Sequence, residues 1–104
     1  MEKETLLITE EETPDGIKLT IRGRINSENA DELQDKLQKI LNAGKKNIVL
    51  NMLWVSFLSS AGIRVILKTY QSAIDAGGKF GIEMPSKNVR NVLGMTALDK
   101  ILIQ

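Results

Sequence analysis

The sequence predicts an α/β fold with a mixed sheet of four to five strands and helices packed against that sheet. Two observations support this prediction. The chain opens with two strand-like segments joined by a tight turn, and it continues with helix-like and strand-like segments in alternation. Strands separated by helices pair in parallel through right-handed crossovers, so the hairpin and the later strands together give a mixed sheet. With 104 residues and no linker or internal repeat, we expect one domain over residues 1–104.

The first two strands form the predicted hairpin. Residues 6–11 (LLITEE) are typical of a strand, and residues 13–16 (TPDG) are typical of a turn, because proline pre-sets the second position and glycine suits the last. Residues 17–25 alternate apolar and polar positions with the period of a half-buried strand. Gly23 within this strand indicates a bulge or a close approach by another backbone.

A first helix is predicted to begin at Ser27 and to end at Gly44. Its first turn is acidic, with Glu28, Asp31 and Glu32, and acidic side chains there interact favourably with the helix dipole. Apolar residues recur at three- and four-residue spacing and predict one buried stripe, which consists of Ala30, Leu33, Leu37, Ile40 and Leu41.

The next segment is predicted to be the central strand. Residues 47–52 (NIVLNM) are apolar without alternation at their centre, as in a strand covered on both faces. Residues 53–58 (LWVSFL) continue this apolar character toward Ser59. Trp54 and Phe57 are expected in the core or at its rim, unless one of them anchors a contact with a partner.

A second helix begins at Ser59 and Ser60 and ends at the glycines of residues 77–78. Its predicted buried stripe consists of Ile63, Ile66, Leu67, Tyr70 and Ile74. A strand at residues 79–84 and a short helix at residues 85–94, ended by Gly94, follow. Residues 101–103 are either a last edge strand or the end of a terminal helix that begins near Thr96.

The composition excludes several kinds of chemistry. The chain contains no cysteine and no histidine, so disulfides are excluded, zinc and haem lose their usual ligands, and we predict no metal site and no cofactor. A Ser-His-Asp hydrolase needs an imidazole as its general base. Lys68 lies two helical turns beyond the serines, too far along the axis to replace that base. We therefore predict no catalytic residue and no enzymatic activity.

Charge and hydropathy restrict the partners. The formal net charge is +1, with −2 on residues 1–52 and +3 on residues 53–104, and the basic residues of the second half are spread along the chain. This distribution predicts no nucleic-acid surface. No apolar run approaches the roughly 18 residues that a membrane span requires, and the start of the chain does not resemble a signal peptide. We expect a cytoplasmic protein without membrane insertion, and its oligomeric state stays open.

The two serines at the predicted helix start allow two interpretations. Unpaired backbone N–H groups at a helix N-terminus bind a capping hydroxyl, so Ser59 or Ser60 caps the helix. Alternatively, one of the serines carries a modification or meets a partner, since a helix N-terminus also stabilises an anion. A nucleotide or phosphate site is a weaker possibility, because only Gly62 follows and no Lys-Ser or Lys-Thr pair does.

Four segments carry a family resemblance: residues 23–26 (GRIN) before a helix, residues 48–51 (IVLN) as a central strand, residues 57–63 (FLSSAGI) at the next helix start, and residues 77–78 before a strand. With these segments the chain resembles a STAS domain of the bacterial anti-sigma factor antagonist type. The resemblance implies that Ser60 is the phosphoacceptor of a partner kinase, which is itself the anti-sigma factor. It also implies a partner switch that regulates transcription: the unmodified domain sequesters the kinase and frees a sigma factor, the phosphorylated domain releases the kinase, and a phosphatase restores the unmodified domain. The partner-binding surface that we expect consists of Asn26, Phe57, Leu58, Ser59, Ser60 and Arg64.

The chain departs from this family at three positions. Asn26, Asn51 and Ser59 stand where the family commonly has aspartate, and the loss of three carboxylates around one site alters its electrostatics. A simpler interpretation is that the two asparagines hydrogen-bond loop backbone while Ser59 caps a helix that begins at Ser60. An alternative function is that of a stand-alone STAS accessory subunit, which docks on a transporter ATPase without phosphorylation.

Overall fold

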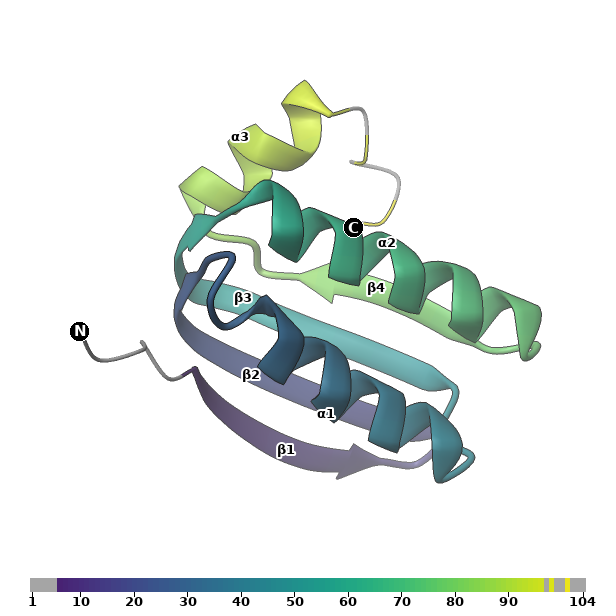
Figure 1. The fold of residues 1–104 in the computed structure, drawn as a ribbon. Coiled ribbons are helices and arrows are strands. Elements are labelled where there is room, and N and C mark those ends of the chain that lie inside the picture. The colour runs from purple at the N-terminus through teal and green to yellow at the C-terminus, as the bar shows by residue number, and fades with distance from the viewer. Residues whose placement is uncertain (1–5, 97, 99–100, 102–104) are drawn as a thin grey trace.

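The chain folds into a four-stranded mixed sheet with three helices (Figure 1). The computed structural model describes residues 6–96, 98 and 101. Along the chain the elements are β1 (Leu7–Thr13), β2 (Gly16–Ile25), α1 (Ala30–Asn42), β3 (Asn47–Leu58), α2 (Ser60–Asp75), β4 (Lys79–Glu83) and α3 (Lys87–Met95).

The strands lie in the sheet in the order of the chain, β1-β2-β3-β4. β1 and β2 pair antiparallel from Leu7↔Arg22 to Thr13↔Gly16, which confirms the predicted hairpin and its turn. β2 pairs with β3 and β3 pairs with β4 in parallel. The predicted mixed sheet, in which a hairpin precedes strands separated by helices, is therefore confirmed.

In the described part of the chain, helices α1 and α2 cover one face of the sheet, and they lie in front of it in Figure 1. The β2-α1-β3 and β3-α2-β4 connections step in the same direction across the sheet, and right-handed crossovers then place both helices on the same face. The prediction that residues 47–52 are covered on both faces is therefore wrong. Leu50 and Met52 are buried beneath the helices, whereas Val49 and Asn51 on the opposite face stay partly exposed.

The core lies between the covered face and the two helices. Aliphatic side chains supply nearly all of it, and each fully buried one stabilises the fold by about 1.5–3 kcal/mol. The buried stripe of α1 agrees with its prediction, with Leu41 partly buried beside Ala30, Leu33, Leu37 and Ile40. The sheet contributes Ile17, Leu19, Ile21 and Ile25 from β2 and Ile48, Leu50, Met52, Val55 and Leu58 from β3.

The buried stripe of α2 differs from its prediction. Leu67 and Ile74 were expected inside but are 36% and 43% exposed. The buried residues of this helix are instead Gly62, Val65, Ile66, Thr69 and Ala73. The stripe therefore begins at a glycine and is rotated by about one residue relative to the prediction.

Helix α3 covers the part of β3 that extends beyond β4. The backbone N–H of Ser86 donates to the carbonyl of Met52 at 3.1 Å, and the Ser86 hydroxyl donates to the carbonyl of Val55 at 2.5 Å. Asn88 Nδ2 donates to the carbonyl of Ser56 at 2.6 Å. These contacts satisfy backbone carbonyl groups of β3 that β4 does not reach, because β4 ends at Glu83.

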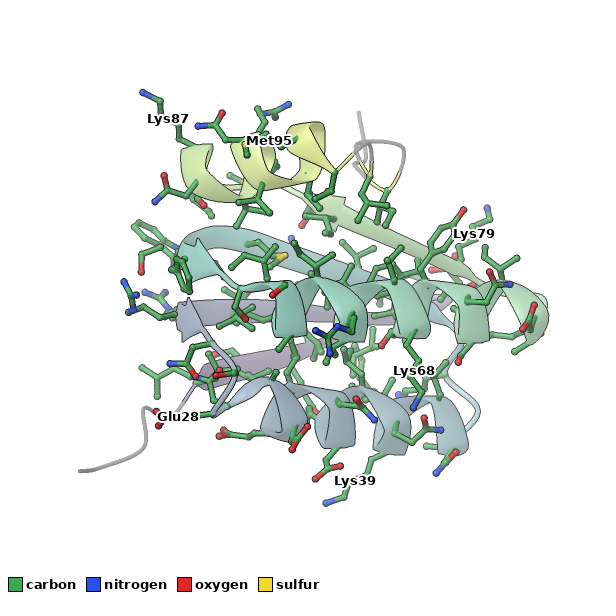
Figure 2. The ribbon with its side chains drawn as sticks, turned by 45° about the horizontal axis from the view of Figure 1, so that its top comes forward. Glu28, Lys39, Lys68, Lys79, Lys87 and Met95 are labelled. Atoms are coloured by element: carbon green, nitrogen blue, oxygen red, sulfur yellow. The ribbon has the colours of Figure 1, made fainter. Side chains whose placement is uncertain are left out.

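Several predicted boundaries shift by a few residues. α1 begins at Ala30 rather than Ser27, and residues 27–29 form a turn before it. α3 continues past Gly94 to Met95, and Thr96 is its C-cap rather than the start of a further helix. Lys87 and Met95, the first and last residues of α3, are labelled in Figure 2.

The predicted terminal element falls mostly on residues 102 and 103, which lie outside the described residues. Ile101 is buried and adopts a 3₁₀ conformation, with its N–H donating to the carbonyl of Leu98 at 3.1 Å. Within the described residues, none of the helices has the length and apolar character that a membrane crossing requires.

Candidate functional site

The serine turn, defined as Ser59 and Ser60, joins the end of β3 to α2. Ser59 is the N-cap of α2, and its hydroxyl oxygen accepts a hydrogen bond from the N–H of Gly62 at 3.2 Å. The N–H of Ser59 donates to the carbonyl of Ile25 at 2.9 Å, which ties the turn to the end of β2. The structure confirms that Ser59 caps a helix beginning at Ser60.

Ser60 is the first residue of α2 and is exposed. Within the described residues, the hydrogen bonds that hold the turn use the Ser59 hydroxyl and not that of Ser60. Arg64 follows four residues later and is also exposed. Residues at this spacing share a helix face, so a guanidinium and a hydroxyl lie along one exposed side of α2.

Asn26 lies beside the serine turn because it directly follows Ile25, which accepts the hydrogen bond from Ser59. Its side-chain oxygen accepts from the N–H groups of Glu28 at 2.9 Å and Asn29 at 3.0 Å. The amide of Asn26 thus organises the turn that leads into α1, as expected of an asparagine that hydrogen-bonds loop backbone.

Asn51 does not belong to this site. It lies on the open face of the sheet, paired with Thr20 on β2 and Glu83 on β4, and its side-chain oxygen accepts from the N–H of Leu53 at 3.1 Å. At the rise of an extended strand, the seven residues from Asn51 to Leu58 span roughly 20 Å. The three positions without aspartate therefore do not surround one site, and only Asn26 and Ser59 lie together.

Phe57 and Leu58 point to opposite faces. Leu58 is 4% exposed and packs in the core, so it supports the serine turn from below and offers a partner no side-chain surface. Phe57 is 39% exposed on the open face, where the guanidinium carbon of Arg24 lies 4.6 Å from the centre of its ring. The other predicted contact residues, Ser59, Ser60 and Arg64, have accessible side chains.

Sequence reasoning missed Asn29, which is fully buried and is the N-cap residue of α1. Its side chain accepts from the N–H of Asn26 at 2.9 Å and donates to the carbonyl of Arg24 at 2.8 Å. The available signal was the spacing of two asparagines three residues apart before a helix, which permits reciprocal bonds like those of a capping box.

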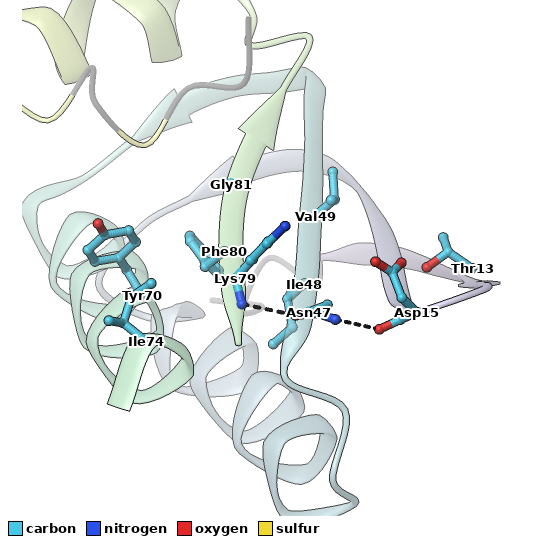
Figure 3. Close-up of a pocket in the computed structure, with 10 residues that line it drawn as sticks. All are labelled: Thr13, Asp15, Asn47, Ile48, Val49, Tyr70, Ile74, Lys79, Phe80 and Gly81. Atoms are coloured by element: carbon cyan, nitrogen blue, oxygen red, sulfur yellow. Dashed lines mark hydrogen bonds between the residues drawn. The ribbon is translucent and has the colours of Figure 1, made fainter. Parts of the chain in front are cut away.

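A pocket of about 410 Å³ lies at the far end of the sheet from the serine turn, near the starts of β3 and β4 (Figure 3). Asn47 bridges its walls: the Asn47 side-chain oxygen accepts from the N–H of Lys79 at 3.1 Å, and Nδ2 donates to the carbonyl of Asp15 at 2.8 Å. None of the predicted site residues lines this pocket. Over residues 6–96, 98 and 101, no group of three or more acidic side chains is placed to hold a metal ion.

Two ion pairs that shift a pKa value lie away from the serine turn. Lys45 Nζ donates to Glu12 Oε1 at 2.5 Å, and this hydrogen bond lowers the pKa of Glu12. Glu83 forms an ion pair with Lys18 across the open face, and the hydrogen bond between them raises the pKa of Lys18. These pairs join neighbouring elements at the surface and are structural.

Comparison with known proteins places the chain in a family. The STAS domain family model matches residues 8–104. The chain is 29% identical over 72 residues to BtrV of Bordetella bronchiseptica, which is named as a candidate anti-sigma factor antagonist. That match covers 69% of this chain and 62% of BtrV, so the chain spans less than two thirds of this relative.

Solved structures agree with this assignment. A protein of Thermotoga maritima, named as a candidate anti-sigma factor antagonist, matches with a TM-score of 0.85 and 28% identity over 91% of this chain and 82% of its own. Unphosphorylated SpoIIAA, an anti-sigma factor antagonist of Bacillus, matches with a TM-score of 0.82 and 17% identity over 93% of this chain and 86% of its own. None of these three relatives is named as a transporter subunit, so the comparisons do not favour the transporter alternative. Since the family model matches nearly the whole chain and the fold agrees, the chain belongs to the STAS domain family, and the relatives described here carry the names of anti-sigma factor antagonists.

Proposed function

We propose that the chain is an anti-sigma factor antagonist whose serine turn binds a kinase-type anti-sigma factor in the cytoplasm. In the unmodified state the antagonist sequesters the kinase and frees a sigma factor for transcription. The bound kinase phosphorylates Ser60, the complex dissociates, and a phosphatase restores the unmodified state. The antagonist itself performs no catalysis in this scheme.

The observation that carries this proposal is the division of roles between the two serines. Ser59 holds the helix start through its bond to the N–H of Gly62, whereas Ser60 is exposed on the first turn of α2. A phosphate on Ser60 would therefore replace no capping bond. The proposed switch needs only a change of local charge, without refolding.

Electrostatics supports both states of the proposed switch. Phosphorylation adds about −1.5 to −2 charges, and the N-terminus of α2 carries the positive end of the helix dipole. Arg64, one turn further along the helix, adds a positive charge on the same side. The free protein thus tolerates the phosphate, whereas its burial in an interface with the kinase would require costly desolvation.

The comparisons supply an independent argument from fold. The phosphorylated form of Bacillus SpoIIAA matches the chain with a TM-score of 0.76 and the unphosphorylated form with 0.82. The fold of SpoIIAA is therefore compatible with both states. In the present chain, Asn26 and Ser59 lack the aspartate charge that the family commonly has there, so its proposed kinase recognises a less acidic serine turn.

Mass spectrometry of the protein purified from its native cell tests the modification. We expect an increase of about 80 Da that maps to Ser60 and disappears in Ser60→Ala but persists in Ser59→Ala. An unmodified chain under every growth condition, or a phosphate on Ser59, would contradict the assignment.

Affinity purification from the same cells tests the partner. Wild-type protein and Ser60→Ala should retain a kinase-type anti-sigma factor, whereas Ser60→Asp should lose it because the added charge lies at the interface. Ser59→Asp is the matched control for charge, since it adds one carboxylate on the neighbouring residue. Equal retention by wild type and Ser60→Asp would argue against release by phosphorylation.

A further inference from the structure

The pocket at the starts of β3 and β4 has the size of a small-molecule site. Its volume of about 410 Å³ lies within the range of roughly 300–1,000 Å³ that is usual for ligand pockets. Asn47 holds its walls together, because the Asn47 side chain bonds the carbonyl of Asp15 on one side and the N–H of Lys79 on the other. The N–H of Lys79 also donates to the carbonyl of Lys46 at 3.0 Å. The pocket is therefore built from backbone segments that the fold already fixes.

The side of the pocket on the open face of the sheet is polar. Asn47 and Val49 lie on this face because they alternate with the buried Ile48, and Asn47 is in register with Lys79 on β4. Asp15 reaches the same region from the turn between β1 and β2. Polar groups from three neighbouring segments thus meet at one end of the sheet.

The side of the pocket next to α2 is apolar. The rings of Tyr70 and Phe80 contact each other edge-on, with their centres 6.2 Å apart. Ile74 follows Tyr70 by four residues on the same face of the helix and is 43% exposed. This wall therefore leaves an accessible apolar surface for a ligand to cover.

Two side chains of opposite charge border the polar side without pairing with each other. Figure 3 shows Asp15 and Lys79 on the two sides of Asn47. Both side chains are exposed, and within residues 6–96, 98 and 101 neither forms an ion pair. Their bonds to Asn47 use only backbone groups, so the carboxylate and the ammonium group stay available.

The spacing of these two charges restricts the ligand. β4 lies two strands away from β2, whose preceding turn carries Asp15, so the two backbones are roughly 10 Å apart. Charge-assisted bonds of about 2.8 Å at both ends take up more than half of this distance. A ligand that binds both groups therefore needs an ammonium group and a carboxylate close together, as in an α-amino acid.

Two other ligand classes fit less well. A nucleotide would bring several negative charges to a pocket in which Lys79 is the one cation among the described lining residues, and Asp15 would repel them. A fatty acid would bind Lys79 but would leave the Asp15 carboxylate close to a like charge and without a partner. The pair of opposite charges favours a zwitterion over either anion.

We propose that this pocket binds a free α-amino acid with an apolar side chain, such as leucine. The Asp15 carboxylate binds the ammonium group of the amino acid, and the Lys79 ammonium group binds its carboxylate. The apolar side chain packs on Ile74 and the ring of Tyr70. The pocket lies at the opposite end of the sheet from the serine turn, so binding does not depend on phosphorylation of Ser60.

NMR titration of the full chain with L-leucine and its analogues tests the ligand class. Leucine should give saturable shifts of the Asn47, Val49 and Gly81 amides, with a dissociation constant of about 1 mM or below. Isoamylamine lacks the carboxylate and 4-methylpentanoate lacks the ammonium group. Each should bind at least about tenfold more weakly, because one charge-assisted bond is lost. Glycine keeps both charges but should also bind more weakly, since it buries no apolar side chain.

Asp15→Asn and Lys79→Gln test the two charged contacts. Both variants keep the backbone groups that bond Asn47, so the walls of the pocket stay in place. Asp15→Asn should abolish the preference for leucine over 4-methylpentanoate, whereas Lys79→Gln should abolish the preference for leucine over isoamylamine. Uniform weakening of all these ligands by both variants would assign the two residues a structural role and would overturn the proposal.

Glu28→Gln and Lys39→Gln are the matched controls. They remove the same charges from exposed positions that do not line the pocket, and both residues are labelled in Figure 2. These controls and Ser60→Ala should keep the wild-type affinity for leucine. Loss of binding in Ser60→Ala, or shifts confined to the serine turn, would place the ligand elsewhere and contradict the assignment. The absence of saturable shifts up to about 10 mM leucine, or equal affinities for leucine and its two analogues, would also overturn it.

Discussion

Asn26 and Asn29 hydrogen-bond each other's backbone across the turn that precedes α1. Asn29 Oδ1 accepts from the N–H of Asn26 at 2.9 Å, and Asn26 Oδ1 accepts from the N–H of Asn29 at 3.0 Å. Asn29 is fully buried, and its Nδ2 also donates to the carbonyl of Arg24 at 2.8 Å. This arrangement fixes the end of β2, to which the N–H of Ser59 is bonded, and so it positions the serine turn.

The two asparagines should respond differently to replacement by aspartate. In these bonds Asn26 uses only its side-chain oxygen, which a carboxylate supplies equally well, so Asn26→Asp should change the free energy of unfolding by less than about 0.5 kcal/mol. Asn29→Asp places a carboxylate against the carbonyl of Arg24 and should cost about 2 kcal/mol or more. Urea unfolding of both variants at neutral pH checks this difference. Similar stabilities would show that the buried donor of Asn29 is dispensable.

The serine turn gives a second comparison of matched variants. Ser59→Ala removes the oxygen that accepts from Gly62 and should lower the free energy of unfolding by about 1 kcal/mol. Ser60→Ala should change it little, because the Ser60 side chain is exposed and does not cap the helix. Denaturant unfolding of unphosphorylated samples measures both effects. A larger loss of stability in Ser60→Ala than in Ser59→Ala would mean that Ser60 caps the helix and that Ser59 is the phosphoacceptor.

The Glu12–Lys45 pair predicts a small pH dependence of stability. The hydrogen bond from Lys45 lowers the pKa of Glu12 in the folded state. A lowered folded pKa gives a stabilising contribution that is present above the unfolded pKa and is lost as the pH falls through the folded value. NMR titration should place the Glu12 carboxyl at a lower pKa in wild type than in Lys45→Gln. Coincident titration curves would exclude the ion pair in solution.

Local periodicity was sufficient to predict much of the fold. The hairpin follows from the Thr13–Gly16 turn signal and the alternation of Ile17, Leu19 and Ile21, since neighbouring residues decide both. The buried stripe of α1 follows from its spacing for the same reason. Local periodicity did not predict the start of α1, because the hydrogen bonds between Asn26 and Asn29 displace the helix N-terminus from Ser27 to Ala30.

The orientation of Trp54 and Phe57 could not be predicted from periodicity. A strict alternation that buries Leu50 and Met52 would also bury Trp54. Two bulges against β2 interrupt this alternation, and they depend on pairing between segments that are distant in sequence. For the same reason the sequence grouped Asn51 with the serine turn, although its pairing with Thr20 and Glu83 holds it in the middle of the sheet.

Helix α2 shows how one close contact overrides a hydrophobic pattern. A Cβ atom on Gly62 would lie 2.6 Å from Ile25 Cγ2 and 2.7 Å from Leu58 Cδ1, both of which belong to buried side chains. Only glycine permits this approach at the end of β3. The helix therefore docks through Gly62, and the larger Leu67 turns outward.

Gly62→Ala should consequently destabilise the protein even though alanine favours a helix. Overpacking against Ile25 and Leu58 costs about 1–3 kcal/mol, which exceeds the gain in helix propensity of up to about 1 kcal/mol. Gly94→Ala in α3 is the matched control, because a Cβ atom there meets nothing within 4 Å and only the gain remains. Thermal and urea unfolding should thus move the two variants in opposite directions. A Gly62→Ala variant as stable as wild type would mean that Ile25 and Leu58 can shift aside, and this contact would then not fix the start of α2, where Ser60 lies.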